Sequence, residues 1–185
     1  MTHNAWKKHP PALVLPVTTS EPSQDFRQQL VELLPRLRRF ARNLTRQPAD
    51  ADDIVQVGIE RALRHQDQWR RDARFDSWMF RIVRNAWIDE VRARGRRNQL
   101  FVQAEAGEHV GHEPIDSEAT LMSVHAAMAR LPEEQRLAVS LVLIEGLPYR
   151  EAAEVLDVPV GTLTSRLARG REALQSLLGD EGDHA

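Results

Sequence analysis

The polar residues best suited to binding a ligand lie near the C-terminal end of the chain. Thr162, Ser165 and Arg169 recur at steps of three and four residues, so they share one face of a predicted helix, with Arg166 beside them. Short hydroxyl side chains let a helix approach a surface closely, and arginine donates hydrogen bonds to guanine edges or phosphates. The spacing therefore favours hydrogen bonding to a nucleic acid.

The distribution of charge supports a polyanionic partner although the net charge is −2. Residues 35–46 contain five arginines and no acid, and residues 61–97 contain eleven arginines against five acids. Residues 101–118 contain five acids and neither lysine nor arginine. The average charge thus conceals two basic segments and an acidic one, and local charge decides which partner a surface attracts.

In the second basic segment, arginines alternate with aromatic residues between Phe75 and Arg94. This combination suits an opened DNA strand, because cations follow the backbone while aromatic faces hold unstacked bases. Trp78, Phe80 and Trp87 can equally belong to a hydrophobic core. For Trp78 and Trp87 the apolar neighbours at helical spacing favour the core.

The elements that must position these side chains are all predicted to be helices. Residues 1–24 form a tail rich in proline. Apolar residues at helical spacing predict a helix from Asp25 to Leu44, with a kink or a break at Pro35, and a second helix that starts at Asp50 or Asp52 and contains Gly58 as a weak point. A third helix is predicted to begin near Asp76 and to end near Gly95.

A second group of helices follows residues 96–117, which lack periodicity and form a predicted acidic linker. Helical spacing resumes over residues 121–131, 133–145, 149–156 and 161–178, and residues 179–185 form a tail. The prediction is therefore an all-α chain with two small helical domains, residues 25–95 and 118–178. The chain has no cysteine and no apolar run near 18 residues, so neither a disulfide nor a membrane insertion is expected.

The last two predicted helices match a helix-turn-helix. Ala152 and Ala153 allow two helices to touch, and residues 157–159 form a tight turn. Leu163, Leu167 and Leu174 are predicted to lie on the buried side of the second helix. An ordinary helical hairpin with solvated arginines remains the alternative.

Three stretches resemble the sigma-70 family of RNA polymerase sigma factors. Residues 158–174, preceded by residues 145–153, resemble the recognition motif of sigma region 4. Residues 51–56 with 60–63 resemble region 2.2, and residues 75–94 resemble regions 2.3 and 2.4. The order and spacing of these blocks, with no recognisable domain between them, favour the extracytoplasmic-function (ECF) subgroup over residues 25–178.

The resemblance implies three sets of binding residues. Polymerase binding is assigned to Asp52, Asp53, Gln56 and Glu60, although the two aspartates can equally stabilise a helix N-terminus. Recognition of the −10 element is assigned to Arg70, Arg71, Arg74, Arg81, Arg84, Asn85 and Arg92, with Asn85 near the pocket for a flipped base and residues 69–74 at its rim. Recognition of the −35 element is assigned to Tyr149, Arg150, Thr162, Thr164, Ser165, Arg166 and Arg169.

The resemblance also implies a function and partners. A sigma factor directs core RNA polymerase, through its β′ and β subunits, to specific promoters and assists the melting of promoter DNA. Control by an anti-sigma factor in a stress or envelope response, and a location in the cytoplasm, are expected. No cofactor or metal is expected, and the acidic linker is expected to thread a positively charged channel of the polymerase.

Two other classes of protein fit less well. A response-regulator output domain shares the helix-turn-helix, but no βα alternation precedes it and the block from Asp52 to Arg97 would have no explanation. A helical hydrolase could use Asp52 and Asp53 with histidines. The seven histidines are scattered, however, and only His109 and His112 lie close together in the sequence.

Overall fold

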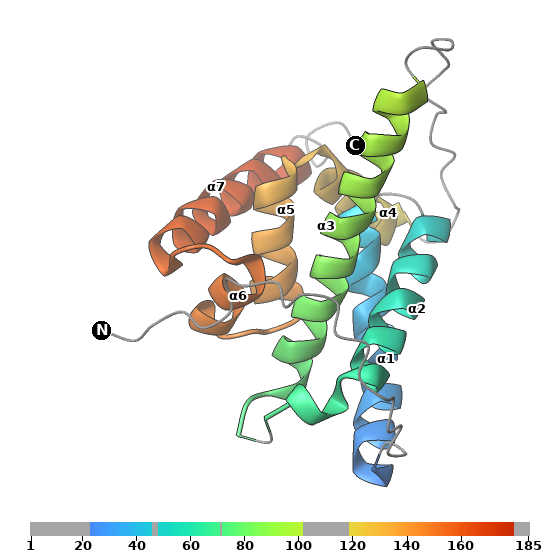
Figure 1. Cartoon of the computed structure of the whole chain (residues 1–185). Helices are drawn as coiled ribbons and strands as arrows, with labels where there is room; N and C mark the ends of the chain where they lie inside the picture. The colour runs from blue at the N-terminus through green and yellow to red at the C-terminus, as the bar shows by residue number, and fades with distance from the viewer. Residues whose placement is uncertain (1–22, 46–47, 71, 102–118, 180–185) are drawn as a thin grey trace.

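The computed structural model describes residues 23–45, 48–70, 72–101 and 119–179. Every regular element within these ranges is helical, which confirms the all-α prediction (Figure 1). The elements are α1 (Gln24–Thr45), α2 (Pro48–Arg64), the 3₁₀ turn η1 (Gln66–Gln68), α3 (Phe75–Phe101), α4 (Ala119–Arg130), α5 (Glu133–Val139), the π-helical turn η2 (Ser140–Ile144), α6 (Tyr149–Leu156) and α7 (Val160–Gly179). None of the helices in these ranges is long and apolar enough to span a membrane.

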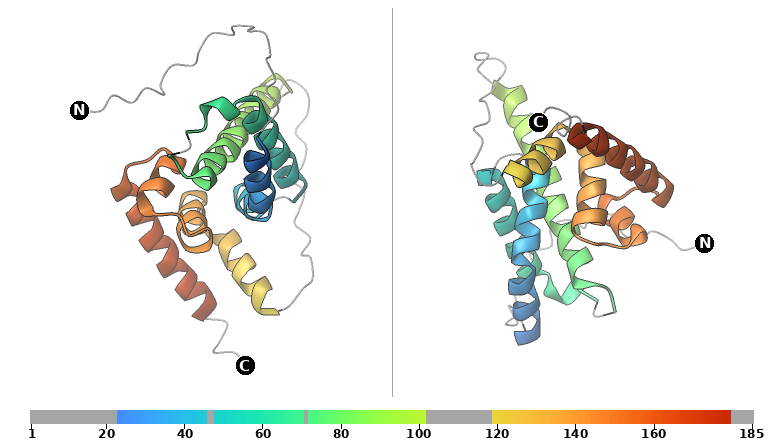
Figure 2. Two further views of the ribbon diagram at one scale, coloured as in Figure 1. Left: turned by 90° about the horizontal axis from the view of Figure 1, so that it is seen from below. Right: turned by 180° about the vertical axis from the view of Figure 1, so that it is seen from behind.

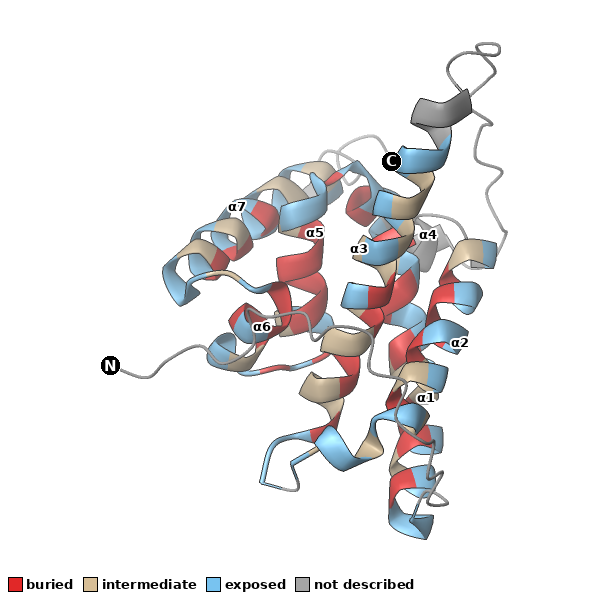
Figure 3. Cartoon of the chain, in the orientation of Figure 1, coloured by how far each residue is buried: buried red, intermediate tan, exposed pale blue. Residues whose placement is uncertain are grey.

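The first domain is a bundle of α1, α2 and α3, which pack against one another in all three pairs. The apolar stripe of α1 enters its core, where Phe40 lies 5.1 Å from Phe80 between ring centroids and Phe26 lies 5.2 Å from Phe75. Both pairs are edge-to-face, the arrangement that aromatic quadrupoles favour. Figure 3 shows the buried faces of these helices turned toward one another.

Two expectations about the helices of this domain are corrected. Of the kink or break predicted at Pro35, the break is wrong, since α1 is a single helix that contains this proline. The predicted end near Gly95 is also wrong, because α3 continues through Gly95 to Phe101. Gly95 is exposed within this helix. A glycine there destabilises the helix by only about 1 kcal/mol relative to alanine, which is too little to end it.

Some aromatic residues of α3 are fully buried in the core, and others are partly exposed. Phe80 is fully buried, as a core residue must be. Trp78 and Trp87 are partly buried and pack against the hydrophobic core, which agrees with the core interpretation favoured for them.

The second domain comprises α4 to α7, with α7 packed against α4, α5 and α6. Its core contains Leu141, Val155 and Leu163, each fully buried. The predicted helix over residues 133–145 is split, because its second half adopts a π-helical turn at Ser140–Ile144. Such turns are rare and often occur at functional sites.

The two domains lie side by side, with α6 against α3 and α5 against α1 (Figure 2). The long helix α3 therefore belongs to the first domain's core on one side and faces the second domain on the other (Figure 1). Most of the predicted tails and linker, residues 1–22, 102–118 and 180–185, fall outside the described residues.

Candidate nucleic-acid interface

The helix-turn-helix predicted for α6 and α7 is present. Asp157 ends α6 in the left-handed conformation, with φ of 51°, and the backbone amide of Val158 donates a hydrogen bond of 3.0 Å to the carbonyl of Ala153. This C-terminal cap turns the chain sharply into α7. Ala152 and Leu163 are fully buried where the two helices meet, so the small residue and the apolar stripe have the roles predicted for them.

The opposite side of α7 offers a polar surface. Thr164, Ser165 and Arg169 are exposed, and Thr162 is partly exposed. The hydroxyl of Thr164 donates to the carbonyl of Val160 at 2.9 Å, and that of Ser165 donates to the carbonyl of Thr162 at 2.9 Å. These bonds fix both side chains close to the helix and leave their oxygen lone pairs able to accept from an approaching base.

Tyr149 and Arg150, at the start of α6, are exposed. Arg150 also pairs with Glu154 one turn later, at 3.4 Å.

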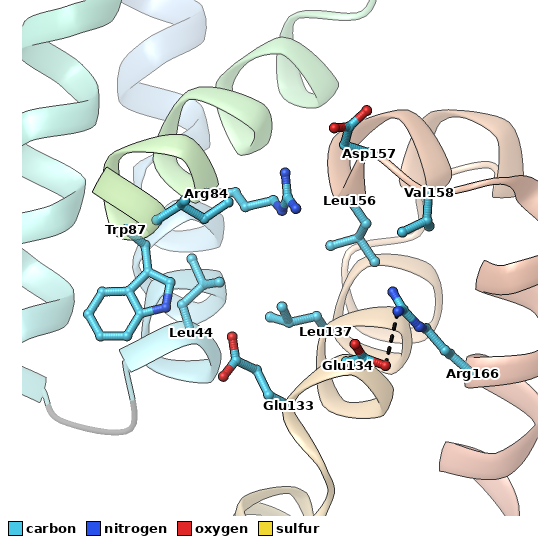
Figure 4. Close-up of a pocket in the computed structure, with 11 residues that line it drawn as sticks. Leu44, Arg84, Trp87, Glu133, Glu134, Leu137, Leu156, Asp157, Val158 and Arg166 are labelled. Atoms are coloured by element: carbon cyan, nitrogen blue, oxygen red, sulfur yellow. Dashed lines mark ion pairs between the residues drawn. The ribbon is translucent and has the colours of Figure 1, made fainter. Parts of the chain in front are cut away.

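Arg166 differs from its neighbours on α7. It forms an ion pair of 2.9 Å with Glu134 of α5, and only 21% of its side chain is exposed. Figure 4 shows this pair at the edge of a cavity of about 270 Å³, which Leu44, Arg84 and Trp87 of the first domain also line. In this conformation Arg166 contributes to the boundary between the domains as well as to the proposed recognition face.

The four residues assigned to polymerase binding lie together on the outer side of α2. Asp52, Asp53, Gln56 and Glu60 are all exposed, while Ala51, Ile54 and Val55 of the same helix are buried. Asp52 lies 3.5 Å from the Arg38 guanidinium of α1, and Glu60 pairs with Arg64 at 3.2 Å. The result is a polar, acid-rich face that is open to a partner.

The residues assigned to the −10 element fall into two groups. Arg70, Asn85 and Arg92 are exposed, and Arg71 lies outside the described residues. Arg70 pairs with Asp72 at 2.6 Å, and the hydrogen bonds from this guanidinium lower the pKa of the Asp72 carboxyl.

The second group, Arg74, Arg81 and Arg84, faces the second domain. Arg74 pairs with Asp76 at 2.7 Å and lies 3.4 Å from Glu151, and Arg81 lies 3.6 Å from Glu154. Arg84 is partly buried between the domains, so desolvation lowers its pKa while the negative charge of Asp157 opposes that shift.

Three residues that sequence reasoning did not assign also meet at this boundary. Arg36 and Arg39 of α1 converge on Glu145, at 3.0 Å and 2.7 Å. The five arginines of residues 35–46, a segment without any acid, indicated the cationic half of this cluster. Nothing in the sequence indicated Glu145 as the partner of these arginines, because Arg36 and Glu145 lie more than a hundred positions apart.

Comparison with known proteins agrees with this geometry. Residues 30–97 match the family model described as sigma-70 region 2, and residues 121–174 match that described as sigma-70, region 4. The chain is 31% identical over 168 residues to the ECF RNA polymerase sigma factor EcfG of Rhodopseudomonas palustris, which covers 91% of this chain and 90% of that protein. It is 34% identical over 139 residues to the ECF RNA polymerase sigma-E factor of Escherichia coli K12, covering 69% of this chain and 73% of that one.

Solved structures show the same fold. The sigma factor RpoE of Bartonella quintana, determined in complex with the anti-sigma factor NepR, superposes with a TM-score of 0.71 and 32% identity, over 84% of this chain and 97% of that chain. CnrH, in complex with the cytosolic domain of CnrY, superposes with a TM-score of 0.62 and 26% identity, over 88% and 92% of the two chains. The chain therefore belongs to the ECF family of sigma-70-type RNA polymerase sigma factors, which are transcription initiation factors and not enzymes.

Proposed function

We propose that this factor directs core RNA polymerase to promoters that it recognises at two separate elements. The observation that carries the proposal is the exposed face of α7, where Thr164, Ser165 and Arg169 stand clear of the domain core. A helix with hydroxyls and arginine on its outer side fits the major groove of duplex DNA, so the −35 element is assigned to this face together with Tyr149, Arg150, Thr162 and Arg166.

The first domain is proposed to bind the polymerase and the −10 element. Its acid-rich face on α2, comprising Asp52, Asp53, Gln56 and Glu60, is the docking surface for the β′ subunit. The −10 element is assigned to Arg70, Arg71, Arg74, Arg81, Arg84, Asn85 and Arg92. Cations beside partly exposed aromatic rings can stabilise an opened strand and so assist melting.

The domain limits follow from the same proposal. Residues 25–95 form the polymerase and −10 domain, residues 96–117 the linker and residues 118–178 the −35 domain, with tails at 1–24 and 179–185. Because α3 continues to Phe101, the first residues of this linker extend the helix. The acidic remainder is proposed to run through a positively charged channel of the polymerase, whose β subunit it would also approach.

A direct test is transcription in vitro. The purified chain is mixed with core polymerase and a pool of genomic promoter fragments, and the transcripts are sequenced from their 5′ ends. Start sites that share −10 and −35 sequences, absent with core alone, are expected. A transcript profile identical to that of core alone would refute the proposal.

Control by an anti-sigma factor is the second part of the proposal. It is supported by the likeness to the Bartonella quintana sigma factor, which was solved with the anti-sigma factor NepR. Such a partner would hold the factor inactive in the cytoplasm until a stress or envelope signal releases it. Affinity capture of the tagged chain from its native host, before and after stress, should recover a protein that suppresses transcription and whose association falls after the stress.

A further inference from the structure

The turn between η1 and α3 carries two of the arginines assigned to the −10 element. Arg70 and Arg74 are both exposed there, and each pairs with an acid two positions later, Asp72 at 2.6 Å and Asp76 at 2.7 Å. In both pairs, two nitrogens of the guanidinium donate hydrogen bonds to the two oxygens of one carboxylate. The direction of these arginines is therefore set by the backbone of the turn, so the groups that fix this backbone are important.

Trp69 closes this turn with its side chain. Its indole Nε1–H donates a hydrogen bond of 3.3 Å to the carbonyl of Ala73, and the Ala73 amide donates one of 2.9 Å to the carbonyl of Arg70. The two hydrogen bonds join the start of the turn to its end. A displaced indole ring would consequently displace Ala73 and the arginines beside it.

The indole ring packs against two phenylalanines. Its centroid lies 5.0 Å from that of Phe75, the first residue of α3, and 6.1 Å from that of Phe26 on α1. Phe26 and Phe75 are 5.2 Å apart, and Trp78 lies 6.1 Å from Phe26 and 5.9 Å from Phe75. We call Phe26, Trp69, Phe75 and Trp78 the aromatic cluster. All of these contacts except that between Phe75 and Trp78 are edge-to-face, an arrangement that depends on orientation and so holds the rings in place.

Phe26 is the member of the aromatic cluster that comes from outside the turn and α3. It contacts each of the other three rings. Only 2% of its surface is exposed, so it cannot touch DNA itself. It also lies four positions before the part of the chain that matches sigma-70 region 2, so that match assigns it no role.

The start of α1 holds Phe26 in its position. The Phe26 amide donates a hydrogen bond of 3.3 Å to the Ser23 hydroxyl, and the Arg27 amide donates one of 3.1 Å to the Ser23 carbonyl. Ser23 therefore caps the helix at its first turn. One turn later, Leu30 is buried in the core of the first domain. The aromatic cluster is thus attached to a fixed end of α1 and not to a loose one.

We propose that Phe26 is a positioning residue for −10 recognition: through the aromatic cluster it holds Trp69, and Trp69 holds the turn that presents Arg70 and Arg74. This inference rests on the −10 role that the proposed function gives to these two arginines. Specific recognition requires the contacting groups to be held within about 0.5 Å of their productive positions. A core residue of α1 therefore contributes to promoter specificity although it makes no contact with DNA.

Three variants separate this role from general packing. Phe26→Leu removes a ring of the aromatic cluster but keeps an apolar side chain. Trp69→Phe keeps a ring beside Phe26 and removes the N–H group that bonds to Ala73. Phe40→Leu is the matched control, because Phe40 is a fully buried ring of the same helix whose edge-to-face partner, Phe80 at 5.1 Å, lies outside the aromatic cluster.

The first test measures how firmly the turn is held in the free, full-length chain. Hydrogen exchange of the Ala73 amide is followed by nuclear magnetic resonance, since this amide bonds to the Arg70 carbonyl. Phe26→Leu and Trp69→Phe should each speed this exchange by roughly tenfold, because amides in a turn exchange through local opening. Phe40→Leu should leave it unchanged although it lowers the free energy of unfolding, since local and global opening are separate events.

The second test measures base discrimination by the holoenzyme formed with core polymerase. Affinity is compared between a promoter with its native −10 sequence and the same promoter with one substituted −10 base. Phe26→Leu and Trp69→Phe should reduce the ratio of the two affinities by about fivefold, which corresponds to one modest base contact. Phe40→Leu should keep the ratio, because a loss of stability alone weakens both affinities alike.

The proposal would be overturned by a wild-type Ala73 amide that exchanges as fast as in an unstructured peptide, or by equal effects of Phe26→Leu and Phe40→Leu on its exchange. A discrimination ratio that these two variants change equally would overturn it as well. The exchange measurement requires neither polymerase nor DNA. If exchange responds as expected but the wild-type holoenzyme ignores the −10 sequence, the proposed function has failed. If the wild type discriminates and Phe26→Leu has no effect on the ratio, only this inference has failed.

Discussion

Gly58 of α2 lies directly against Val83 of α3, so closely that a Cβ atom on the glycine would meet the Val83 Cγ2 atom at 2.9 Å. Val83 is fully buried and cannot move aside easily. Gly58 therefore lowers the stability of α2 itself, but it allows α2 and α3 to pack closely together. Sequence reasoning identified the cost of this glycine, and the structure supplies the reason for it.

Replacement of Gly58 by alanine should consequently destabilise the first domain, by about 1–3 kcal/mol for forced overpacking of a core. Urea unfolding followed by circular dichroism measures the change. Gly95→Ala is the matched control, since nothing lies within 4 Å of a Cβ at that position in α3. It should stabilise the protein by up to about 1 kcal/mol, through helix propensity alone. Equal effects of the two substitutions would show that packing against Val83 is not limiting.

The ion pair between Asp50 and Arg94 should make stability depend on pH. Arg94 donates two hydrogen bonds of 2.8 Å to the Asp50 carboxylate, and these lower its pKa although burial opposes the shift. A lowered folded-state pKa means that the stabilisation is present above the unfolded value of about 3.9 and is lost as the pH falls through the folded value.

Asp50→Asn should therefore reduce the free energy of unfolding by about 1 kcal/mol at neutral pH, and the difference should shrink as the pH falls below the unfolded value of about 3.9. Chemical unfolding at several pH values measures it. Asp53→Asn, on the exposed side of the same helix, serves as the control, and its effect should be smaller. A difference between wild type and Asp50→Asn that stays constant from neutral to acid pH would contradict the assignment.

Arginine substitutions on α7 should weaken −35 recognition. Arg169→Ala is expected to cost about 1–3 kcal/mol if the side chain contacts a base, and to relax sequence preference at that position. Arg166→Ala should have a similar cost in the holoenzyme, with an additional change in stability because its pair with Glu134 is lost.

Holoenzyme binding to duplexes with intact and altered −35 sequences measures both effects. Arg171→Ala is the control, because it removes an exposed arginine of the same helix outside the assigned face. Equal losses for Arg169→Ala and Arg171→Ala on all sequences would indicate general electrostatics rather than base recognition.

Substitutions on the acid-rich face of α2 should weaken polymerase binding without unfolding the domain. Asp53→Lys combined with Gln56→Ala changes two exposed residues, so the thermal midpoint should shift little while the affinity for core polymerase falls at least tenfold. Fluorescence titration with core measures the affinity. Glu32→Lys, on an exposed position of α1, is the matched charge reversal. If it weakens binding as much as the α2 variant does, the docking surface is misplaced.

The helical fold and the family were predictable because their signals are local. Apolar spacing defined α1, α2, α6 and α7, and the helix-turn-helix depends on a few neighbours, such as Ala152, Asp157 and Leu163, whose types are dictated by contacts within some twenty residues. Helix ends were predicted less well. Pro35 and Gly95 are helix breakers by propensity, but α1 and α3 continue through them. Propensity is a weak preference that tertiary packing can override.

The sequence by itself determined that the chain is helical and which faces of most helices are apolar and which are polar. Only the tertiary structure decided what those faces meet. Arg39 and Glu145 are 106 positions apart, and Arg81 meets Glu154 from another domain. The attraction between charges acts through space and leaves no periodic pattern along the chain, so the contacts between the two domains became visible only in the folded molecule.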